Sequence, residues 1–270
     1  MEYTNMTRKI IPIVGGGSDD WEKYAKDLLA GTENPATAPD DSPLIVTANI
    51  DKRQYIKVPQ KGIVIAISET LHNNQWKPTI ENLATQGLFM PRPDYMTQHF
   101  VNVREAAAGR GKLFYADGTQ LSPAEITGIW DYISSTDRKK FNGKVCWTWL
   151  DALFKKDTNN KLYMETDHRV AGGAMRSTNL NLSGHMATNS LANLSFNNEG
   201  LPNVASPHTS YKQGENMYFW PPVENRVARF VAGSVSAYLY CDWVPASSDP
   251  QLGVFACAAG IAPKNSGGTA

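Results

Sequence analysis

The chain has 270 residues, of which 41% are hydrophobic, and 26 basic side chains balance 26 acidic ones. This apolar content is enough for the core of one large domain or two smaller ones. A balanced charge lacks the basic surface that binding to nucleic acid or to an anionic membrane requires. The sequence shows no signal peptide and no apolar run long enough to span a membrane, so we expect neither nucleic-acid binding nor membrane insertion.

The first 88 residues predict a small α/β module. Residues 10–14 form an apolar run typical of a strand, and a helix is expected after Ser18, a favourable N-cap. Two further β-rich runs, at 44–48 and 62–67, are typical of a hairpin or small sheet. We expect this part to be an attachment or homo-oligomerisation module, or an extension packed onto the main domain.

A larger domain is predicted for residues 89–270, beginning at a proline-rich stretch. Residues 95–108 have helical spacing, and a short strand is expected at 112–115. Ser122 is followed by a proline and, three residues after the serine, by Glu125, the pattern of a capping box at the start of a second helix.

The middle of this domain gives weaker signals. Residues 145–154 are densely aromatic and predict a core element that could be strand or helix. Residues 171–211 are rich in Asn, Ser, Gly and Thr without periodicity, so this tract is either disordered or a set of ordered functional loops. The fold implied by the resemblance described below favours loops, which Asn and Ser side chains can stabilise by bonds to the backbone. Residues 217–220, with the sequence MYFW, are followed by two prolines and resemble the aromatic strand that precedes the lead-in in the family named below.

The segment 226–257 carries the strongest functional signal. Its two ends have the apolar patterns of ordered elements, whereas the residues between them follow no period. Tyr238, Tyr240 and Trp243 lie there among Ser, Ala and Pro residues. Rigid aromatic side chains on a small polar background are typical of antibody paratopes. We therefore expect recognition rather than catalysis, with the three aromatic side chains as the main sources of binding energy.

The ends of this segment resemble a known family. The lead-in Arg-x-x-x-Gly-Ser falls on Arg229, Gly233 and Ser234, and a Gly-hydrophobe-hydrophobe exit begins at Gly253. These features are similar to variable proteins of diversity-generating retroelements, which include phage tropism determinants. The match departs from the family at Val235, where Trp is usual, and in the exit, where Val-Phe-Ala replaces Gly-Phe-Arg. From Val235 to residue 250, every residue except Trp243 belongs to the set that NNY codons encode.

The resemblance implies an α+β protein with a C-type lectin-like fold of the formylglycine-generating-enzyme type. In this fold, two helices pack against a twisted antiparallel sheet with long ordered loops. The implied function is display of a hypervariable surface, within about residues 229–257, that attaches a virion tail tip or a cell surface to a protein or other surface ligand. The expected ligand-binding residues are Phe230, Val231, Val235, Ala237, Tyr238, Tyr240, Asp242, Trp243, Val244, Ala246, Ser247, Ser248 and Asp249. The expected scaffold residues are Trp220, Arg229, Gly233, Ser234, Gly253 and Phe255.

Nothing in the sequence predicts catalytic residues, a cofactor or a metal site. The cysteines Cys146, Cys241 and Cys257 are too scattered for a disulfide framework or a zinc site. We expect Cys257 to be buried and Cys241 to be a surface thiol. The only candidates for a catalytic imidazole are His168, which follows Asp167, and His185, which follows Gly184. The calcium-binding motifs of sugar-binding C-type lectins are absent.

Three alternatives remain open from the sequence. Tyr238 and Tyr240, with Leu239 and Cys241 between them, have the period of a buried strand, in which case the segment belongs to the core. The protein could also be a structural tail or fibre subunit without diversification. An oxidase of the formylglycine-generating type would use Cys241 and Cys257, but a catalytic cysteine inside a variable segment would lack fixed geometry.

Overall fold

The structure is a computed structural model that describes residues 45–46, 48–134, 145–233 and 236–261. The strand predicted at 10–14 and the helix predicted after Ser18 lie outside the described residues. All described residues belong to one compact unit.

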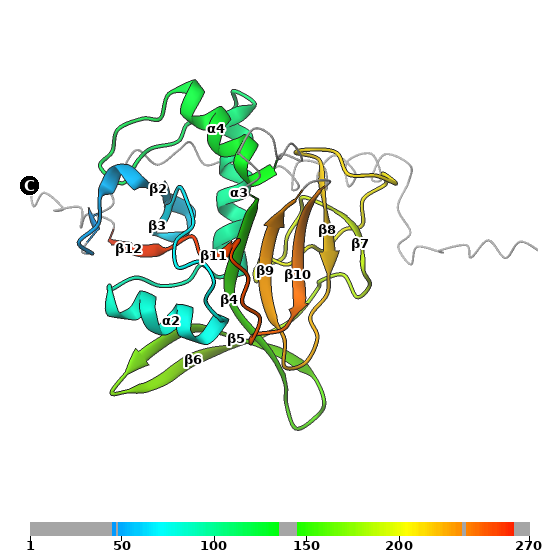
Figure 1. Ribbon diagram of the computed structural model, residues 1–270. Coiled ribbons are helices and arrows are strands. Elements are labelled where there is room, and N and C mark those ends of the chain that lie inside the picture. The colour runs from blue at the N-terminus through cyan, green and yellow to red at the C-terminus, as the bar shows by residue number, and fades with distance from the viewer. Residues whose placement is uncertain (1–44, 47, 135–144, 234–235, 262–270) are drawn as a thin grey trace, which may run out of the picture. The chain divides into compact units, whose positions relative to one another are not determined.

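The described residues form an α+β fold, as the sequence predicts (Figure 1). Three α-helices and two sheets occur in this part of the chain, together with two short 3-10 helices. In chain order the elements are β1 (Ile45–Val46), η1 (Lys52–Gln54), β2 (Tyr55–Val58), η2 (Pro59–Lys61), β3 (Ile63–Ala66), α2 (Trp76–Thr85), α3 (Pro93–Ala107), α4 (Pro123–Ser134), β4 (Cys146–Lys156), β5 (Leu162–Ala171), β6 (Ala174–Asn181), β7 (Ser190–Asn193), β8 (Asn216–Trp220), β9 (Val227–Ala232), β10 (Ala237–Trp243), β11 (Leu252–Gly253) and β12 (Cys257–Ile261).

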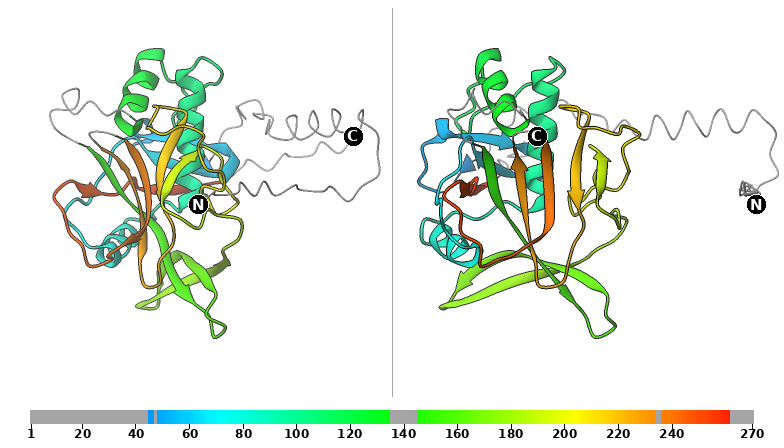
Figure 2. Two further views of the ribbon diagram at one scale, coloured as in Figure 1. Left: turned by 90° about the vertical axis from the view of Figure 1, so that its right-hand side faces the viewer. Right: turned by 45° about the vertical axis from the view of Figure 1, so that its right-hand side comes forward.

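The larger sheet has the strand order β6-β5-β4-β9-β10-β8-β7, and β11 pairs with β4 off this path. Its pairs are antiparallel except for β10 with β8 and β11 with β4, which are parallel. Figure 2 shows the twist of this sheet, with the β5–β6 hairpin turned away from β8 and β7. Because β10 lies between β9 and β8, the strand after the Gly233 turn occupies an interior position of the sheet.

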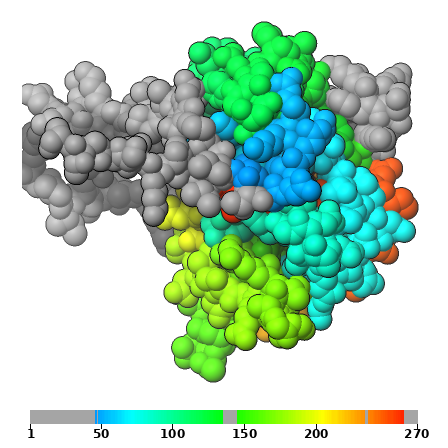
Figure 3. Space-filling view, turned by 90° about the vertical axis from the view of Figure 1, so that its left-hand side faces the viewer, coloured from blue at the N-terminus to red at the C-terminus, as the bar shows by residue number. Residues whose placement is uncertain are grey.

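The smaller sheet joins segments from both ends of the described chain, in the order β1-β12-β3-β2. Ile65 of β3 pairs with Cys257 of β12. In the space-filling view, the blue surface of the β2 region directly borders the green surface of the helices (Figure 3). Residues 45–88 share a sheet with the C-terminal strand and belong to the same compact unit, which favours the expected extension of the main domain over a separate module.

Helices α3 and α4 cover one face of the larger sheet. On α3, Met96, Phe100 and Val103 point into the core, and the Phe100 ring lies 5.6 Å from that of Phe230 on β9. The capping box predicted for α4 is confirmed, since the Ser122 N–H donates to Glu125 Oε2 at 2.7 Å and the Glu125 N–H donates to Ser122 Oγ at 3.3 Å. These two helices match the pair expected from the sequence.

The aromatic stretch at 145–154, for which the element type was left open, is part of the strand β4. Other expectations needed correction. Residues 112–115 contribute only isolated bridges rather than the expected strand. Helix α2 was not anticipated, and the tract 171–211 contains β6 and β7 as well as loops. Its loops are held by side chains as predicted: Asn197 Nδ2 donates to the Ser183 carbonyl at 2.7 Å, and Asn197 Oδ1 accepts from the Leu201 N–H at 2.7 Å.

Candidate functional site

The segment expected to be irregular begins with a regular strand, β10. Its side chains alternate between the two faces of the sheet, because successive residues of a strand point to opposite sides. Leu239 and Cys241 are fully buried, while Tyr238 and Tyr240 are half-buried. The period-two alternative is therefore right about the backbone, and the same strand still presents tyrosines on its outer face.

Five side chains form what we call the aromatic face: Tyr218 and Trp220 from β8, and Tyr238, Tyr240 and Trp243 from β10. The strand register places Tyr238 beside Tyr218 and Tyr240 beside Trp220. The ring centroids are 5.4 Å apart for Tyr218 and Tyr238, 4.7 Å for Trp220 and Tyr240, and 5.9 Å for Tyr240 and Trp243. An open depression of about 390 Å³ adjoins Tyr218, Trp220 and Tyr238.

Arg229 on β9 lies at one edge of this face, opposite Tyr240 in the register. Its guanidinium carbon is 3.2 Å from the ring centroid of Trp243, 4.7 Å from that of Tyr240 and 5.1 Å from that of Trp147. The residue is only 5% exposed, and its Nε and Nη1 atoms have no hydrogen-bond partner. Burial lowers the pKa of Arg229 to about 10, and nearby Tyr240, Asp242 and Asp249 oppose that shift.

Several residues expected at the ligand surface are elsewhere. Phe230 and Ala237 point into the helix-covered core, and Val231 is buried although it shares a face with Tyr238. The cause is the strand alternation of β9 and β10, which the sequence interpretation considered only as an alternative to a ligand surface. Val235 lies outside the described residues. The remaining expected residues reach the surface at least in part: Tyr238, Tyr240, Asp242, Trp243, Val244, Ala246, Ser247, Ser248 and Asp249.

The expected scaffold residues take mixed positions. Phe255 is buried, and its N–H donates to Thr148 Oγ1 at 3.1 Å. A Cβ on Gly253 would lie 2.8 Å from the Thr70 carbonyl oxygen, so this position requires glycine. Gly233 begins a turn in which its N–H donates to the Ser236 carbonyl at 2.9 Å. Trp220, however, is half-buried on the aromatic face, and Ser234 lies outside the described residues.

The sequence interpretation missed Tyr218 and Trp147. Tyr218 and Trp220 alternate within residues 216–220, and this spacing could have placed both on one face of the predicted strand. Trp147 pairs with Val231 across β4 and β9, a contact between residues far apart in sequence. Only knowledge of the strand order could have placed Trp147 beside Arg229.

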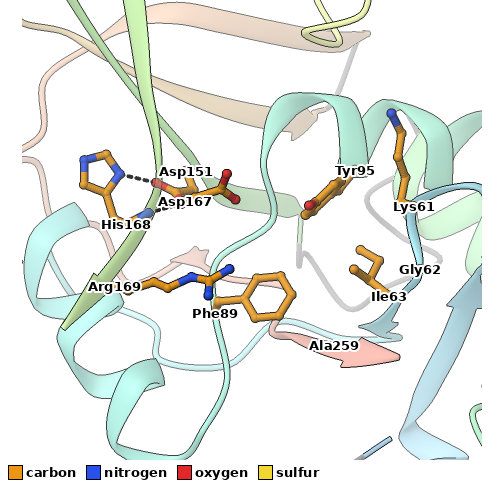
Figure 4. Close-up of a pocket in the computed structure, with 10 residues that line it drawn as sticks. All are labelled: Lys61, Gly62, Ile63, Phe89, Tyr95, Asp151, Asp167, His168, Arg169 and Ala259. Carbon is orange, nitrogen blue, oxygen red and sulfur yellow. Dashed lines mark hydrogen bonds and ion pairs between the residues drawn. The ribbon is translucent and has the colours of Figure 1, made fainter. Parts of the chain in front are cut away.

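A second polar site surrounds a pocket of about 200 Å³ between β3, α3, β5 and β12. Figure 4 shows His168 and Asp151 on one side of this pocket and Tyr95 and Lys61 on the other. His168 Nδ1 lies 2.5 Å from Asp151 Oδ1, and the His168 N–H donates to Asp151 Oδ2 at 2.9 Å. Both residues are buried. Burial raises the pKa of Asp151, and hydrogen bonding to His168 opposes that rise.

Ion pairs extend from this pocket to the start of α3. Arg92 Nη1 lies 3.1 Å from Asp167 Oδ2, and its Nε and Nη2 each donate to Asp94 at 2.8 Å. Lys61 Nζ reaches Asp94 at the same distance. The ten residues that line the pocket include no Ser, Thr or Cys. The only hydroxyl among these ten residues is that of Tyr95, and burial raises its pKa, which disfavours the reactive phenolate.

All three cysteines are free and buried. Cys241 is therefore not the surface thiol that we expected, because its side chain points to the core face of β10. Burial raises the pKa of the Cys241 and Cys257 thiols well above the usual range, which disfavours the reactive thiolate. In the described ranges, no group of three or more His, Cys, Asp or Glu side chains is arranged to hold a metal ion.

No helix in the described part of the chain has the length and apolar character needed to cross a membrane.

Comparison with known proteins finds no matching family model, no matching curated protein and no matching solved structure.

Proposed function

We propose that this protein binds a protein ligand through the aromatic face of its larger sheet. One observation carries the proposal: five aromatic side chains from β8 and β10 form a continuous, half-exposed surface beside an open depression. Large aromatic side chains supply most of the binding energy at protein interfaces, and they lose little entropy when they are already packed against one another.

The finer interpretation is that the scaffold is C-type lectin-like and belongs to a variable protein of a diversity-generating retroelement. Two helices on one face of a largely antiparallel sheet support the scaffold, as do long loops held by asparagine side chains. The surface positions of β10 and the following turn support tolerance to substitution, since their side chains point away from the core. The buried, high-pKa thiols favour binding over the oxidase alternative.

The binding face is tested by replacing a central ring. We expect Tyr240→Ala to weaken binding of peptides selected on the wild-type protein from a random display library by about tenfold to a hundredfold, because hot-spot truncations cost about 2 kcal/mol or more. Titration calorimetry with those peptides measures the change. Tyr163→Ala, which removes a half-buried tyrosine from β5, is the matched control and should leave affinity unchanged. Equal losses in both variants, or none in Tyr240→Ala, would contradict the proposal.

Diversification is tested separately, in the DNA around the gene. The retroelement interpretation requires a reverse transcriptase gene and a near-copy of the DNA that encodes residues 229–257, with mismatches at adenines of the copy. The strand alternation predicts where these mismatches occur. They should fall on codons for outward residues such as Tyr238, Tyr240 and Ser248. The codons for the buried residues Leu239 and Cys241 should be unchanged. A neighbourhood without the copy and the reverse transcriptase would leave the binding face without a diversifying mechanism.

A further inference from the structure

The edge of the aromatic face next to Arg229 concentrates unsatisfied polar atoms. Ten buried side-chain nitrogen or oxygen atoms of the described residues lack a hydrogen-bond partner. Five of these atoms belong to four residues at this edge of the aromatic face. They are Trp147 Nε1, Arg229 Nε, Arg229 Nη1, Asp242 Oδ1 and Trp243 Nε1. Buried polar groups are nearly always paired, so a cluster of unpaired ones at a candidate interface points to a group that the ligand supplies.

The unpaired atoms define the chemistry of that group. Four of the five are N–H donors, from one guanidinium and two indoles, and they require an acceptor. A guanidinium presents its donors as a planar fork that matches the two oxygens of a carboxylate. The fifth atom, Asp242 Oδ1, requires a donor such as a backbone N–H beside that carboxylate.

The surrounding charges favour a single carboxylate over a polyanion. Asp242 and Asp249 both act electrostatically on Arg229 without bonding to it. A ligand with several negative charges would meet these two carboxylates, whereas one carboxylate adds a single charge beside a buried cation. The chain as a whole is neutral, so it offers no wider positive field for a polyanion.

We propose that Arg229 is the electrostatic anchor of the ligand site and receives an acidic side chain of the protein partner, rather than serving only as a scaffold residue. This inference rests on the proposed function, since it names the partner's chemistry at the same face. Arg229 is 5% exposed and covered by the Trp243 ring. The incoming carboxylate therefore displaces that ring, which then packs against the partner.

The position of Trp243 suits such a movement. It lies at the end of β10, where the register with β9 shifts between Tyr240 and Trp243. Val244, the next residue, is 44% exposed. Trp243 also packs against the buried cluster that includes Trp149, Val227 and Leu252. Its ring therefore stands at the boundary between the covered and the open part of this sheet face.

The first test uses the wild-type protein, so it does not depend on a variant that folds. N-acetyl-aspartate amide is titrated into ¹⁵N-labelled protein while the Nε–H resonance of Arg229 is followed by NMR. We expect a saturable shift with a millimolar dissociation constant, downfield because the proton leaves the shielding region of the Trp243 ring. The neutral N-acetyl-asparagine amide should produce no shift. No response to the aspartate probe, or the same response to both probes, would overturn the inference.

The second test uses the library-selected peptides. We expect these peptides to be enriched in Asp or Glu, and we expect Arg229→Gln to weaken their binding at least tenfold, while Arg176→Gln on exposed β6 has no effect. Arg229→Lys, which keeps the charge without the fork, should recover part of the affinity. If Tyr240→Ala abolishes binding and Arg229→Gln does not, the anchor is wrong and the binding face stands. If neither change affects binding, the proposed function is wrong as well.

Discussion

Replacing Gly200 with alanine is expected to cost the protein roughly 3–5 kcal/mol of unfolding free energy or to prevent folding. Gly200 is buried with φ at +80°, a conformation that costs an L-residue about 1–2 kcal/mol. A Cβ there would lie 2.2 Å from the Asp94 backbone nitrogen and 2.5 Å from the Pro93 carbonyl carbon. Those atoms belong to the first turn of α3, which cannot move without disturbing the core. Urea denaturation of wild type and variant measures the loss.

Gly184→Ala is the matched control. Gly184 has φ at +67°, and nothing lies within 4 Å of the position of an added Cβ. This variant therefore carries the backbone cost alone, about 1–2 kcal/mol. The difference between the two variants isolates the close approach of the loop to α3. Equal losses would show that the loop around Gly200 does not pack against the start of this helix.

The sequence predicted those parts of the fold that depend on neighbouring residues. The capping box at Ser122 and the apolar spacing of Met96, Phe100 and Val103 are local signals, and both helices lie where they indicate. The strand expected at 217–220 came from the family resemblance, and β8 lies at that place. Helix α2 gave a weaker signal, because Pro78 lies within it and no side chain caps its N-terminus.

The errors have a common physical origin in contacts between distant segments. The sequence could not decide between a separate module and an extension for residues 45–88, because β12 inserts between β1 and β3, a pairing across most of the chain that no linker composition reveals. At β10, the alternation of Leu239 and Cys241 with Tyr238 and Tyr240 was visible in the sequence, but it was interpreted as a competing core strand and not as one strand with a buried and a half-exposed face. The ligand surface was predicted from composition instead, which assigned Phe230 and Ala237 to it although both are buried.

The candidate site shows the same division. Tyr238, Tyr240 and Trp243 could be selected from the sequence because aromatic residues on a small polar background are typical of recognition surfaces. The environment of Arg229 could not, because it is created by the adjacency of β4, β9 and β10. The family resemblance suggested a scaffold role for Arg229. The unpaired nitrogen atoms of Arg229 became visible only once Trp147 and Trp243 were placed around this side chain.

The buried pair of Asp151 and His168 also depends on a feature without a local signal. Between β5 and β6 the register shifts at residues 166–169, and Asp167 adopts φ of +52° at that point. This irregularity allows both the N–H and the ring of His168 to reach the Asp151 carboxylate. Thr166 Oγ1 donates to the Asp151 carbonyl at 2.6 Å, so β4 holds the irregular segment at three points.

Removing this carboxylate is expected to destabilise the protein by roughly 3–5 kcal/mol, because Asp151→Ala leaves the His168 N–H and ring nitrogen buried without an acceptor. Asp151→Asn keeps an acceptor oxygen and should lose less.

The control is the exposed pair of His208 and Glu215, whose atoms are 3.0 Å apart, and Glu215→Gln should cost less than about 1 kcal/mol. Urea denaturation compares the three variants. If Asp151→Ala loses no more than Glu215→Gln, water satisfies His168 and the segment does not depend on Asp151. If the larger loss is found, the contacts of Asp151 with His168 hold the irregular segment of β5 in place. Asp167, the residue before His168, contacts Arg92, which also contacts Asp94 at the start of α3. The Gly200 loop packs on that same turn of α3.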